Sequence, residues 1–264
     1  MRKVLSIAGS DPSGGAGLQA DLKTFAAHHC YGMAVPVALT AQNTQGVQAV
    51  LGLDATFVAA QLQSIAADIR PDAIKLGMLF SRPIMEAVLA FLQGLPGVPV
   101  VADPVMVATS GDRLLLAEAE EFLKEQLLPA ATLITPNRAE AEVLWGRPIA
   151  TPAQANEAAQ ALASRLGTAV LLKGGHPTSP QTAEATDLLA LPDGTVQTFS
   201  LPRLHTPHTH GTGCTLSAAL ACRLAEGHTL PQATQLAKAY LHRALAAGQH
   251  LGIGQGRGPV WHQV

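Results

Sequence analysis

The chain has 264 residues, of which 48% are hydrophobic and 14% are charged, so it can bury a sizeable core and is not expected to be disordered. The formal net charge at pH 7 is -2, and lysine and arginine form no block, so nothing favours a nucleic-acid partner. No apolar stretch approaches the roughly 20 residues of a membrane-spanning helix, and the first apolar run reaches Gly9 too soon for a signal peptide. We therefore expect a cytoplasmic protein with no membrane partner.

Short apolar runs alternate with longer amphipathic segments along the chain. In chain order we predict a strand at residues 4–8, a helix at 18–29, a strand at 33–39, a helix capped by Asp54 and extending to about 69, a strand at 73–76, a helix at 84–93, a strand at 98–102, a helix at 118–127, a strand at 133–135, a helix at 151–166 and a strand at 169–173. A hairpin at 186–191 and 195–200 follows, and helices at about 215–226 and 230–248 complete the pattern. Pro36 within the second strand indicates an edge strand or a bulge.

This alternation predicts a mostly parallel central sheet with helices on both faces. No linker, repeat or low-complexity segment interrupts it, so we predict one α/β domain over residues 1–264. Ligands of such sheets bind beyond the carboxyl ends of the strands. Polar residues gather at those ends: Ser10, Gln42, Asp103, Asn137 and Lys173. A binding site is therefore expected at this edge of the sheet.

A glycine-rich segment, residues 9–17, follows the first predicted strand. It lacks the G-x-G-x-x-G spacing of a dinucleotide fingerprint, and it lacks the Gly-Lys-Ser/Thr ending of a Walker A loop. By itself it is best interpreted as a turn that lets a helix pack closely on a strand. Asp21 lies in the following helix, and its spacing leaves its role open.

A second glycine-rich segment, His208 to Ser217, is typical of a loop that becomes a helix and leaves backbone N–H groups free to bind an anion such as phosphate. Cys214 stands at that helix start, where the helix dipole favours a thiolate. A buried structural cysteine is the alternative, and it is the preferred interpretation for Cys30 and Cys222. His205, His208 and His210 lack further metal-ligating partners and are interpreted as polar loop residues.

Three charged residues near strand ends have both structural and functional interpretations. Asn137 and Glu140 have the spacing of a capping box, and Glu140 together with Asp103 could instead help to hold hydrated Mg²⁺. Asp103 is otherwise an ordinary turn residue of an Asp-Pro step. Lys173, which opens the sequence Lys-Gly-Gly-His, could bind phosphate or could extend to solvent at the rim of the sheet.

Several motifs occur in a fixed order along nearly the whole chain. They are AGSDPSGGAGLQADLKTF at 8–25, ALTAQNT at 38–44, KLGML at 75–79, DPVM at 103–106, TPN at 135–137, LKGGH at 172–176 and THGTGCT at 209–215. With these motifs the chain resembles the hydroxymethylpyrimidine/phosphomethylpyrimidine kinases of thiamin biosynthesis, which belong to the ribokinase-like superfamily. The first and last motifs are long and specific, and the middle ones are shared with pyridoxal kinases.

The resemblance implies a ribokinase-like fold and ATP-dependent, Mg²⁺-assisted phosphorylation of a pyrimidine hydroxymethyl group, followed by a second turnover on the monophosphate. It implies that Cys214 stands where superfamily sugar kinases have an aspartate base, and that the amides of Gly211, Thr212, Gly213 and Cys214 form an anion hole. As a proton acceptor near neutral pH, Cys214 would need a lowered pKa. The remaining implied roles are substrate binding by Gly9, Asp21, Gln42, Met78 and Val105, ATP binding by Asn137, Lys173 and Lys238, and organisation of Mg²⁺ by Asp103 and Glu140.

Three other functions are alternatives to this one. A pyridoxal or pyridoxine kinase, or a dual-specificity enzyme, has the same fold, although Gln42 and Cys214 favour the pyrimidine. A non-catalytic binder of thiamin precursors is disfavoured by the set of Asp103, Glu140, Lys173 and Cys214. A dinucleotide oxidoreductase is disfavoured by the missing fingerprint. Because ribokinase relatives often cover the substrate with a lid or a partner subunit, we expect a homodimer.

Overall fold

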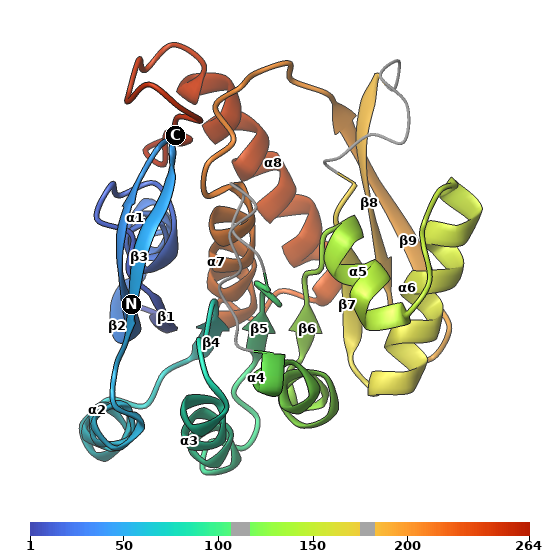
Figure 1. Cartoon of the computed structure of the whole chain (residues 1–264). Coiled ribbons are helices and arrows are strands. Elements are labelled where there is room, and N and C mark those ends of the chain that lie inside the picture. The colour runs from blue at the N-terminus through green and yellow to red at the C-terminus, as the bar shows by residue number, and fades with distance from the viewer. Residues whose placement is uncertain (107–116, 175–182) are drawn as a thin grey trace.

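One sheet runs through the computed structural model, which describes residues 1–106, 117–174 and 183–264 (Figure 1). Within these residues the strand order is β3-β2-β1-β4-β5-β6-β7-β8-β9. The strands are β1 (Lys3–Gly9), β2 (Tyr31–Asn43), β3 (Gly46–Gly52), β4 (Ala73–Leu76), β5 (Val100–Ala102), β6 (Leu133–Ile134), β7 (Ala169–Leu172), β8 (Glu184–Ala190) and β9 (Val196–Pro202). Pairing is parallel from β2 through β7, and β3, β8 and β9 add antiparallel pairs at the two sides. The prediction of a mostly parallel sheet is confirmed.

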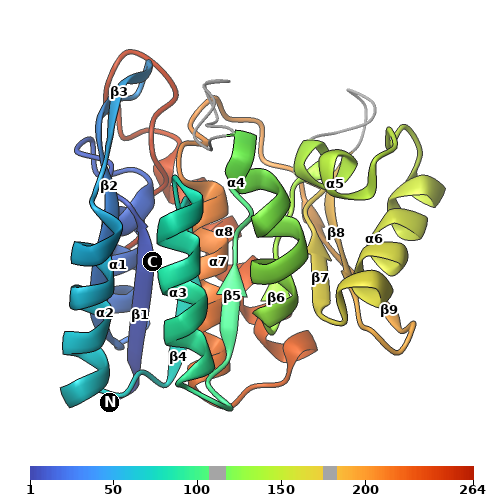
Figure 2. The ribbon, with the colours of Figure 1, turned by 60° about the horizontal axis from the view of Figure 1, so that its bottom comes forward.

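Helices cover both faces of this sheet, as predicted (Figure 2). They are α1 (Gly17–Ala27), α2 (Ala55–Asp68), α3 (Arg82–Gln93), α4 (Ala117–Phe122) with its continuations η1 (Leu123–Leu127) and η2 (Leu128–Ala130), α5 (Arg138–Trp145), α6 (Pro152–Leu166), α7 (Thr212–Ala225) and α8 (Leu230–Gly248). One core packs α2 to α6 against the sheet, and the other packs α1, α7 and α8 against the opposite face. None of the helices in the described part of the chain is long and apolar enough to cross a membrane.

Strand β2 differs from its prediction in both length and neighbours. Opposite β1 its register shifts between Pro36 and Ala38, so the bulge that Pro36 indicates is confirmed. The edge prediction also holds at Pro36, because β3 pairs only with residues 38–43 of β2 and leaves the preceding part of the strand at the edge of the described sheet. Strand β3 was not predicted. Its residues are largely exposed and lack clear alternation, so its strand conformation depends on pairing with β2.

Helix α7 positions the functional end of the molecule. Its middle, from Thr215 to Cys222, is buried, and small residues such as Ala218, Ala219 and Ala221 let it approach β1, β4 and β5 closely. The helix therefore lies under the parallel strands and points its N-terminus at their carboxyl ends. Because the N-terminus begins at Thr212 rather than at the predicted residue 215, the whole sequence Thr-Gly-Cys lies within its first turn.

Candidate active site

A cavity of about 610 Å³ opens at the carboxyl edge of the parallel strands. Its wall includes nearly all the residues that the sequence predicted for the site: Gly9, Gln42, Met78, Asp103, Val105, Asn137, Glu140, Lys173, Gly211, Thr212, Gly213, Cys214 and Lys238. These residues come from loops and elements that are far apart in sequence, and the parallel topology brings them to one edge. Asp21 does not belong to the wall. Gly175 and His176 of the Lys-Gly-Gly-His sequence lie outside the described residues.

The N-terminus of α7 forms one side of this cavity. Gly211 is the N-cap residue in a left-handed conformation (φ 75), and neither a side-chain cap nor an acidic residue occupies the first turn. A Cβ at Gly211 would lie 1.8 Å from the Gly15 carbonyl oxygen, so only glycine fits. The Thr212 N–H donates to the Thr209 carbonyl oxygen at 3.3 Å, and the amides that follow it, together with the positive end of the helix dipole, make this position suitable for an anion.

A buried ion pair faces the start of α7. Lys173 Nζ donates to Asp103 Oδ1 at 2.8 Å, and Thr135 Oγ1 donates to the same oxygen at 3.0 Å. A Cβ on Gly213 would lie 3.2 Å from Asp103 Oδ2 and 3.3 Å from Lys173 Nζ, so both groups stand against the helix backbone. Burial lowers the pKa of Lys173, but Asp103 and Glu140 raise it more, and the net shift is upward. Lys173 is therefore a charged cavity residue and does not extend to solvent.

Asn137 and Glu140 form the predicted capping box at the start of α5. The Asn137 backbone N–H donates to Glu140 Oε2 at 2.7 Å, and the Glu140 N–H donates to Asn137 Oδ1 at 3.0 Å. Glu140 nevertheless lines the cavity, where burial raises its pKa to about 7 although Lys173 opposes the shift. Its structural role is thus confirmed, and its carboxyl group remains beside Asp103 and Lys173.

Cys214 differs from its predicted electrostatic state. Burial raises the pKa of its thiol to about 11, although the charge of Lys75 and a hydrogen bond from the Gly17 amide lower it. The carboxylates of Asp21 and Asp103 act in the same direction as burial. The expectation of a lowered pKa is therefore wrong for the free protein, because desolvation outweighs the helix dipole.

Asp21 lies beneath the cavity rather than in its wall. Its side chain has no exposed surface, and Oδ2 accepts hydrogen bonds from Lys75 Nζ at 2.7 Å and Ser6 Oγ at 2.6 Å. The predicted direct contact between Asp21 and the substrate does not fit this position. Its partner Lys75 does line the cavity, so Asp21 is connected to the site only indirectly, by its ion pair with Lys75.

Two charged residues of the site were missed by the sequence analysis. Lys75 interrupts the apolar strand β4, and Asp187 lies buried in the mixed strand β8. Asp187 accepts from Lys238 Nζ at 2.6 Å and from the Gly174 N–H at 2.8 Å, so it holds the predicted ATP-binding lysine against the end of β7. An ionisable residue inside an otherwise apolar strand was the available signal for Lys75, whereas β8 contains Glu184 and Thr186 as well and gave no such signal for Asp187.

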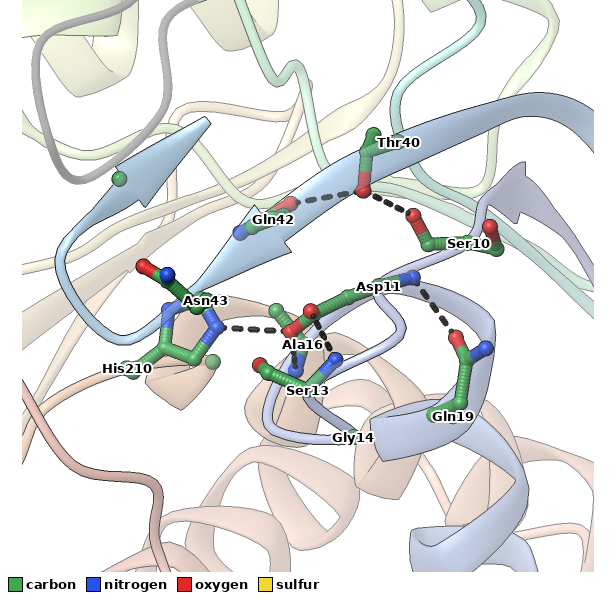
Figure 3. Close-up of polar contacts among 12 residues, drawn as sticks. Ser10, Asp11, Ser13, Gly14, Ala16, Gln19, Thr40, Gln42, Asn43 and His210 are labelled. Atoms are coloured by element: carbon green, nitrogen blue, oxygen red, sulfur yellow. Dashed lines mark hydrogen bonds and ion pairs between the residues drawn. The ribbon is translucent and has the colours of Figure 1, made fainter. Parts of the chain in front are cut away.

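The opposite end of the cavity carries the residues implied for ring binding. Gly9 is packed so closely that an added Cβ would lie 2.6 Å from Met78 Cε. Thr40 Oγ1 lies 2.8 Å from the Ser10 carbonyl oxygen, to which it donates, and 3.2 Å from Gln42 Oε1 (Figure 3). An apolar surface and an amide thus stand side by side, which suits a flat heterocycle with polar substituents.

Comparisons with known proteins agree with this geometry. Residues 11–261 match the family described as phosphomethylpyrimidine kinase. The hydroxymethylpyrimidine/phosphomethylpyrimidine kinase of Rhizobium meliloti is 50% identical over 261 residues, which cover 98% of this chain and 96% of the relative. Among solved structures, a phosphomethylpyrimidine kinase from Clostridium difficile has a TM-score of 0.80 at 39% identity, covering 92% of this chain and 99% of that one.

The ADP complex of Bacillus subtilis pyridoxal kinase has a TM-score of 0.88 at 37% identity, covering 99% of this chain and 97% of that one. The fold is therefore the predicted ribokinase-like fold. With a match over nearly its full length and a cavity that combines an open helix N-terminus, a lysine and a cysteine, this chain belongs to the phosphomethylpyrimidine kinase family.

Proposed function

We propose that this chain is a cytoplasmic, single-domain kinase that uses ATP to phosphorylate 4-amino-5-hydroxymethyl-2-methylpyrimidine and then its monophosphate, in thiamin biosynthesis. The observation that carries the proposal is that one cavity contains the open amides of α7 with Cys214 and Lys173, and also Gln42 and Met78. The ADP bound to the Bacillus subtilis relative supports a nucleotide as the phosphoryl donor.

In this proposal the chain contributes mainly positioning and charge. The transferred phosphoryl group would lie at the N-terminus of α7, where backbone amides and Lys173 meet its negative charge. Lys173 would exchange its bond to Asp103 for one to the phosphate. Lys238, held by Asp187, would meet the nucleotide at the other side of the strand ends, and Asn137 would border it. Gln42, Gly9, Met78 and Val105 would hold the ring so that its hydroxymethyl group faces Cys214.

The residues of the site fit a hydrated Mg²⁺ ion. Asp103 and Glu140 are neighbouring carboxyl groups, and Mg²⁺ retains several waters while taking few carboxylates. No group of three or more His, Cys, Asp or Glu side chains that could hold a metal ion occurs among the described residues. When bound, Mg²⁺ would neutralise phosphate charge. It would also favour the ionised form of Glu140, whose pKa burial raises.

Cys214 is the proposed proton acceptor for the substrate hydroxyl. With a thiol pKa of about 11 in the free protein, this role requires that the bound substrates and cations lower the pKa. We expect Cys214→Ala to reduce kcat by about 100-fold, as for the loss of a general base. Cys214→Asp should retain more activity and shift the pH dependence of kcat towards lower pH. Near-normal turnover of Cys214→Ala would overturn the assignment.

A coupled assay of ADP formation tests the function directly. The pyrimidine alcohol, its monophosphate and pyridoxal are compared as substrates at equal concentration, with and without Mg²⁺. We expect both pyrimidines to be phosphorylated with higher kcat/KM than pyridoxal. The similarity to the Bacillus subtilis pyridoxal kinase makes pyridoxal the second candidate, and a higher kcat/KM for pyridoxal would establish that function instead. If no ADP forms with any of the three substrates, the proposed kinase activity towards them is overturned.

We also propose a homodimer that is formed through the β2–β3 hairpin. Leu39 and Leu51 face each other across the two strands and are 44% and 65% exposed, and the neighbouring pair Ala41 and Ala49 is also exposed. This contiguous apolar face next to the cavity is suited to a second copy. Light scattering should give a dimer for the wild type and a monomer for Leu51→Glu. A monomeric wild type at micromolar concentration would contradict the proposal.

A further inference from the structure

Two glycine-rich loops that lie far apart in sequence interlock beside the cavity. We call residues 9–17 the first glycine loop and residues 209–214 the second glycine loop. A Cβ on Gly211 would lie 1.8 Å from the Gly15 carbonyl oxygen, and a Cβ on Gly15 would lie 2.5 Å from His210 Cδ2. Each loop thus occupies the space where a side chain of the other would be. One loop therefore cannot shift without displacing the other.

A buried hydrogen bond joins these loops across 199 positions of the sequence. His210 Nε2 lies 2.7 Å from Asp11 Oδ2, and the two side chains are only 9% and 2% exposed (Figure 3). The carboxylate can only accept, so Nε2 is the donor. His210 is thus a polar loop residue, as interpreted, but it is buried and links the two loops.

Asp11 also organises the first glycine loop. Its Oδ1 accepts the Ser13 N–H at 2.9 Å, and its Oδ2 accepts the Ala16 N–H at 2.8 Å in addition to His210. Burial raises the pKa of Asp11, but the bonds from His210 and Ser13 outweigh it, and the pKa is lowered overall. The ionised carboxylate is thus shared between donors of both loops.

Asp11 and His210 are each adjacent in sequence to a residue that lines the cavity. Ser10, which precedes Asp11, accepts the hydrogen bond of Thr40, whose hydroxyl also lies 3.2 Å from Gln42 Oε1. His210 immediately precedes Gly211, the N-cap of α7. A continuous chain of contacts therefore runs from the ring-binding amide of Gln42 to the amides at the start of α7.

We propose that Asp11 and His210 form a clamp that fixes the distance between the ring-binding end of the cavity and the anion site of α7. They are positioning residues for phosphoryl transfer, a role that rests on the proposed function. A misplacement of about 1 Å between reacting groups costs on the order of 100-fold in rate. Loosening the clamp leaves each half of the site intact, so the loss falls on kcat and much less on the binding of either substrate.

Substitutions at His210 separate the hydrogen bond from the packing of the ring. His210→Phe keeps a ring next to Gly15 but removes the donor, whereas His210→Gln places an amide N–H at a similar reach. We expect His210→Phe to lower kcat by about 30-fold, with the KM values for ATP and the pyrimidine within about threefold of wild type. His210→Gln should recover at least half of the lost factor on a logarithmic scale. The double variant with Asp11→Asn should be no slower than the slower single variant.

His28 provides the matched control. It is also buried, its Nδ1 lies 2.9 Å from the Thr24 carbonyl oxygen, and it packs against Tyr240 without lining the cavity. His28→Phe should lower the melting temperature and leave kcat unchanged. Equal losses of kcat in His28→Phe and His210→Phe would mean that general destabilisation explains the effect, and would overturn the clamp.

Hydrogen exchange measures the clamp independently of activity. We expect Asp11→Asn to speed amide exchange in peptides covering the second glycine loop, and His210→Phe to do so in the first, with slower exchange restored by His210→Gln. Faster exchange confined to the substituted loop would overturn the proposal, as would a His210→Gln variant no better than His210→Phe. If the wild type phosphorylated neither the pyrimidines nor pyridoxal, the proposed function would fail, and the exchange pattern would still decide whether the loops are clamped.

Discussion

Helices α1 and α7 begin at the same edge of the sheet, each in a glycine-rich loop and each without a side-chain N-cap. Gly17 and Gly211 are both left-handed, with φ of 55 and 75, and a Cβ on either would meet a backbone oxygen, at 2.4 Å for Gly17 and 1.8 Å for Gly211. Around α1 the chain supplies the acceptors: Asp11 takes the Ser13 and Ala16 amides, and the Gly17 amide donates to the Cys214 sulfur.

Around α7 the first turn has no acidic residue, and the Asp103 carboxylate that faces it is paired with Lys173. The two helix starts therefore share a backbone geometry but have different roles. Where the chain carries its own anion, the amides build a scaffold. Where the nearby carboxylate is paired with a lysine, as Asp103 is with Lys173, the amides remain available to a phosphate. The predictions below test this difference, beginning with the largest expected effect.

Replacing Gly211 should abolish the open helix start. Gly211→Ala forces a left-handed alanine into the Gly15 carbonyl, and we expect kcat/KM to fall by about 1,000-fold because the amides are displaced. Gly227→Ala at the other end of α7 is the control. It has φ of 91 but nothing within 4 Å of an added Cβ, so it should cost only about 1 kcal/mol of stability. Steady-state kinetics and thermal unfolding measure both, and similar kinetic losses would contradict the difference.

The open helix start should also depend on its added cation. Lys173→Met removes the charge that faces the amides, and we expect kcat/KM for ATP to fall by about 100-fold. Lys124→Met, which breaks a pair with Glu120 on the outside of the molecule, should change it by less than about twofold. If kcat/KM for ATP of Lys173→Met stays within threefold of wild type, the amides of α7 are sufficient for phosphate binding without Lys173.

Glu140 should make the free protein less stable as the pH rises. Its pKa is raised by burial to about 7, so the folded state binds this proton more tightly than the unfolded state does. Stability contributed by the protonated group is therefore full below the ordinary glutamate pKa and is lost between about pH 4.5 and pH 7. Without Mg²⁺, Glu140→Gln should match wild type at pH 4.5 and exceed it by about 3 kcal/mol at pH 8.5.

Denaturant unfolding at the two pH values measures this effect, and exposed Glu157→Gln is the control. The same Glu140→Gln variant should lose Mg²⁺-dependent activity, because the anion that weakens the free protein is the proposed partner of the cation. Equal stability of Glu140→Gln and wild type at pH 8.5 would contradict the buried, partly ionised carboxyl group.

A capped helix completes the series with the smallest effect. Asp54 caps α2 on the outside of the molecule, where its side chain accepts the Thr56 and Phe57 amides. Asp54→Ala should lower the free energy of unfolding by about 1 kcal/mol and leave kcat/KM unchanged. We expect no loss of activity, because α2 and α7 pack on opposite faces of the sheet. A loss would contradict this and mean that α2 affects the geometry of the cavity.

The sequence alone determined the features that depend on neighbouring residues. Caps, turns and periodicity are local, so the sequence predicted the alternation of strands and helices, the capping box of Asn137 and Glu140, the bulge at Pro36 and a helix start near Cys214. The polar residues at strand ends could be gathered into one site, because parallel strands bring their carboxyl ends to one edge.

Only the tertiary structure decided how charges are paired and how deeply they are buried. Lys75 with Asp21, Lys173 with Asp103, and His210 with Asp11 join residues 54, 70 and 199 positions apart, and no local pattern encodes such partners. Burial also reversed the expected shift of the Cys214 pKa and removed Asp21 from the cavity wall. Desolvation depends on everything that surrounds a group, whereas a helix dipole is visible from the sequence. That is why the location of the site followed from the sequence and its electrostatic state did not.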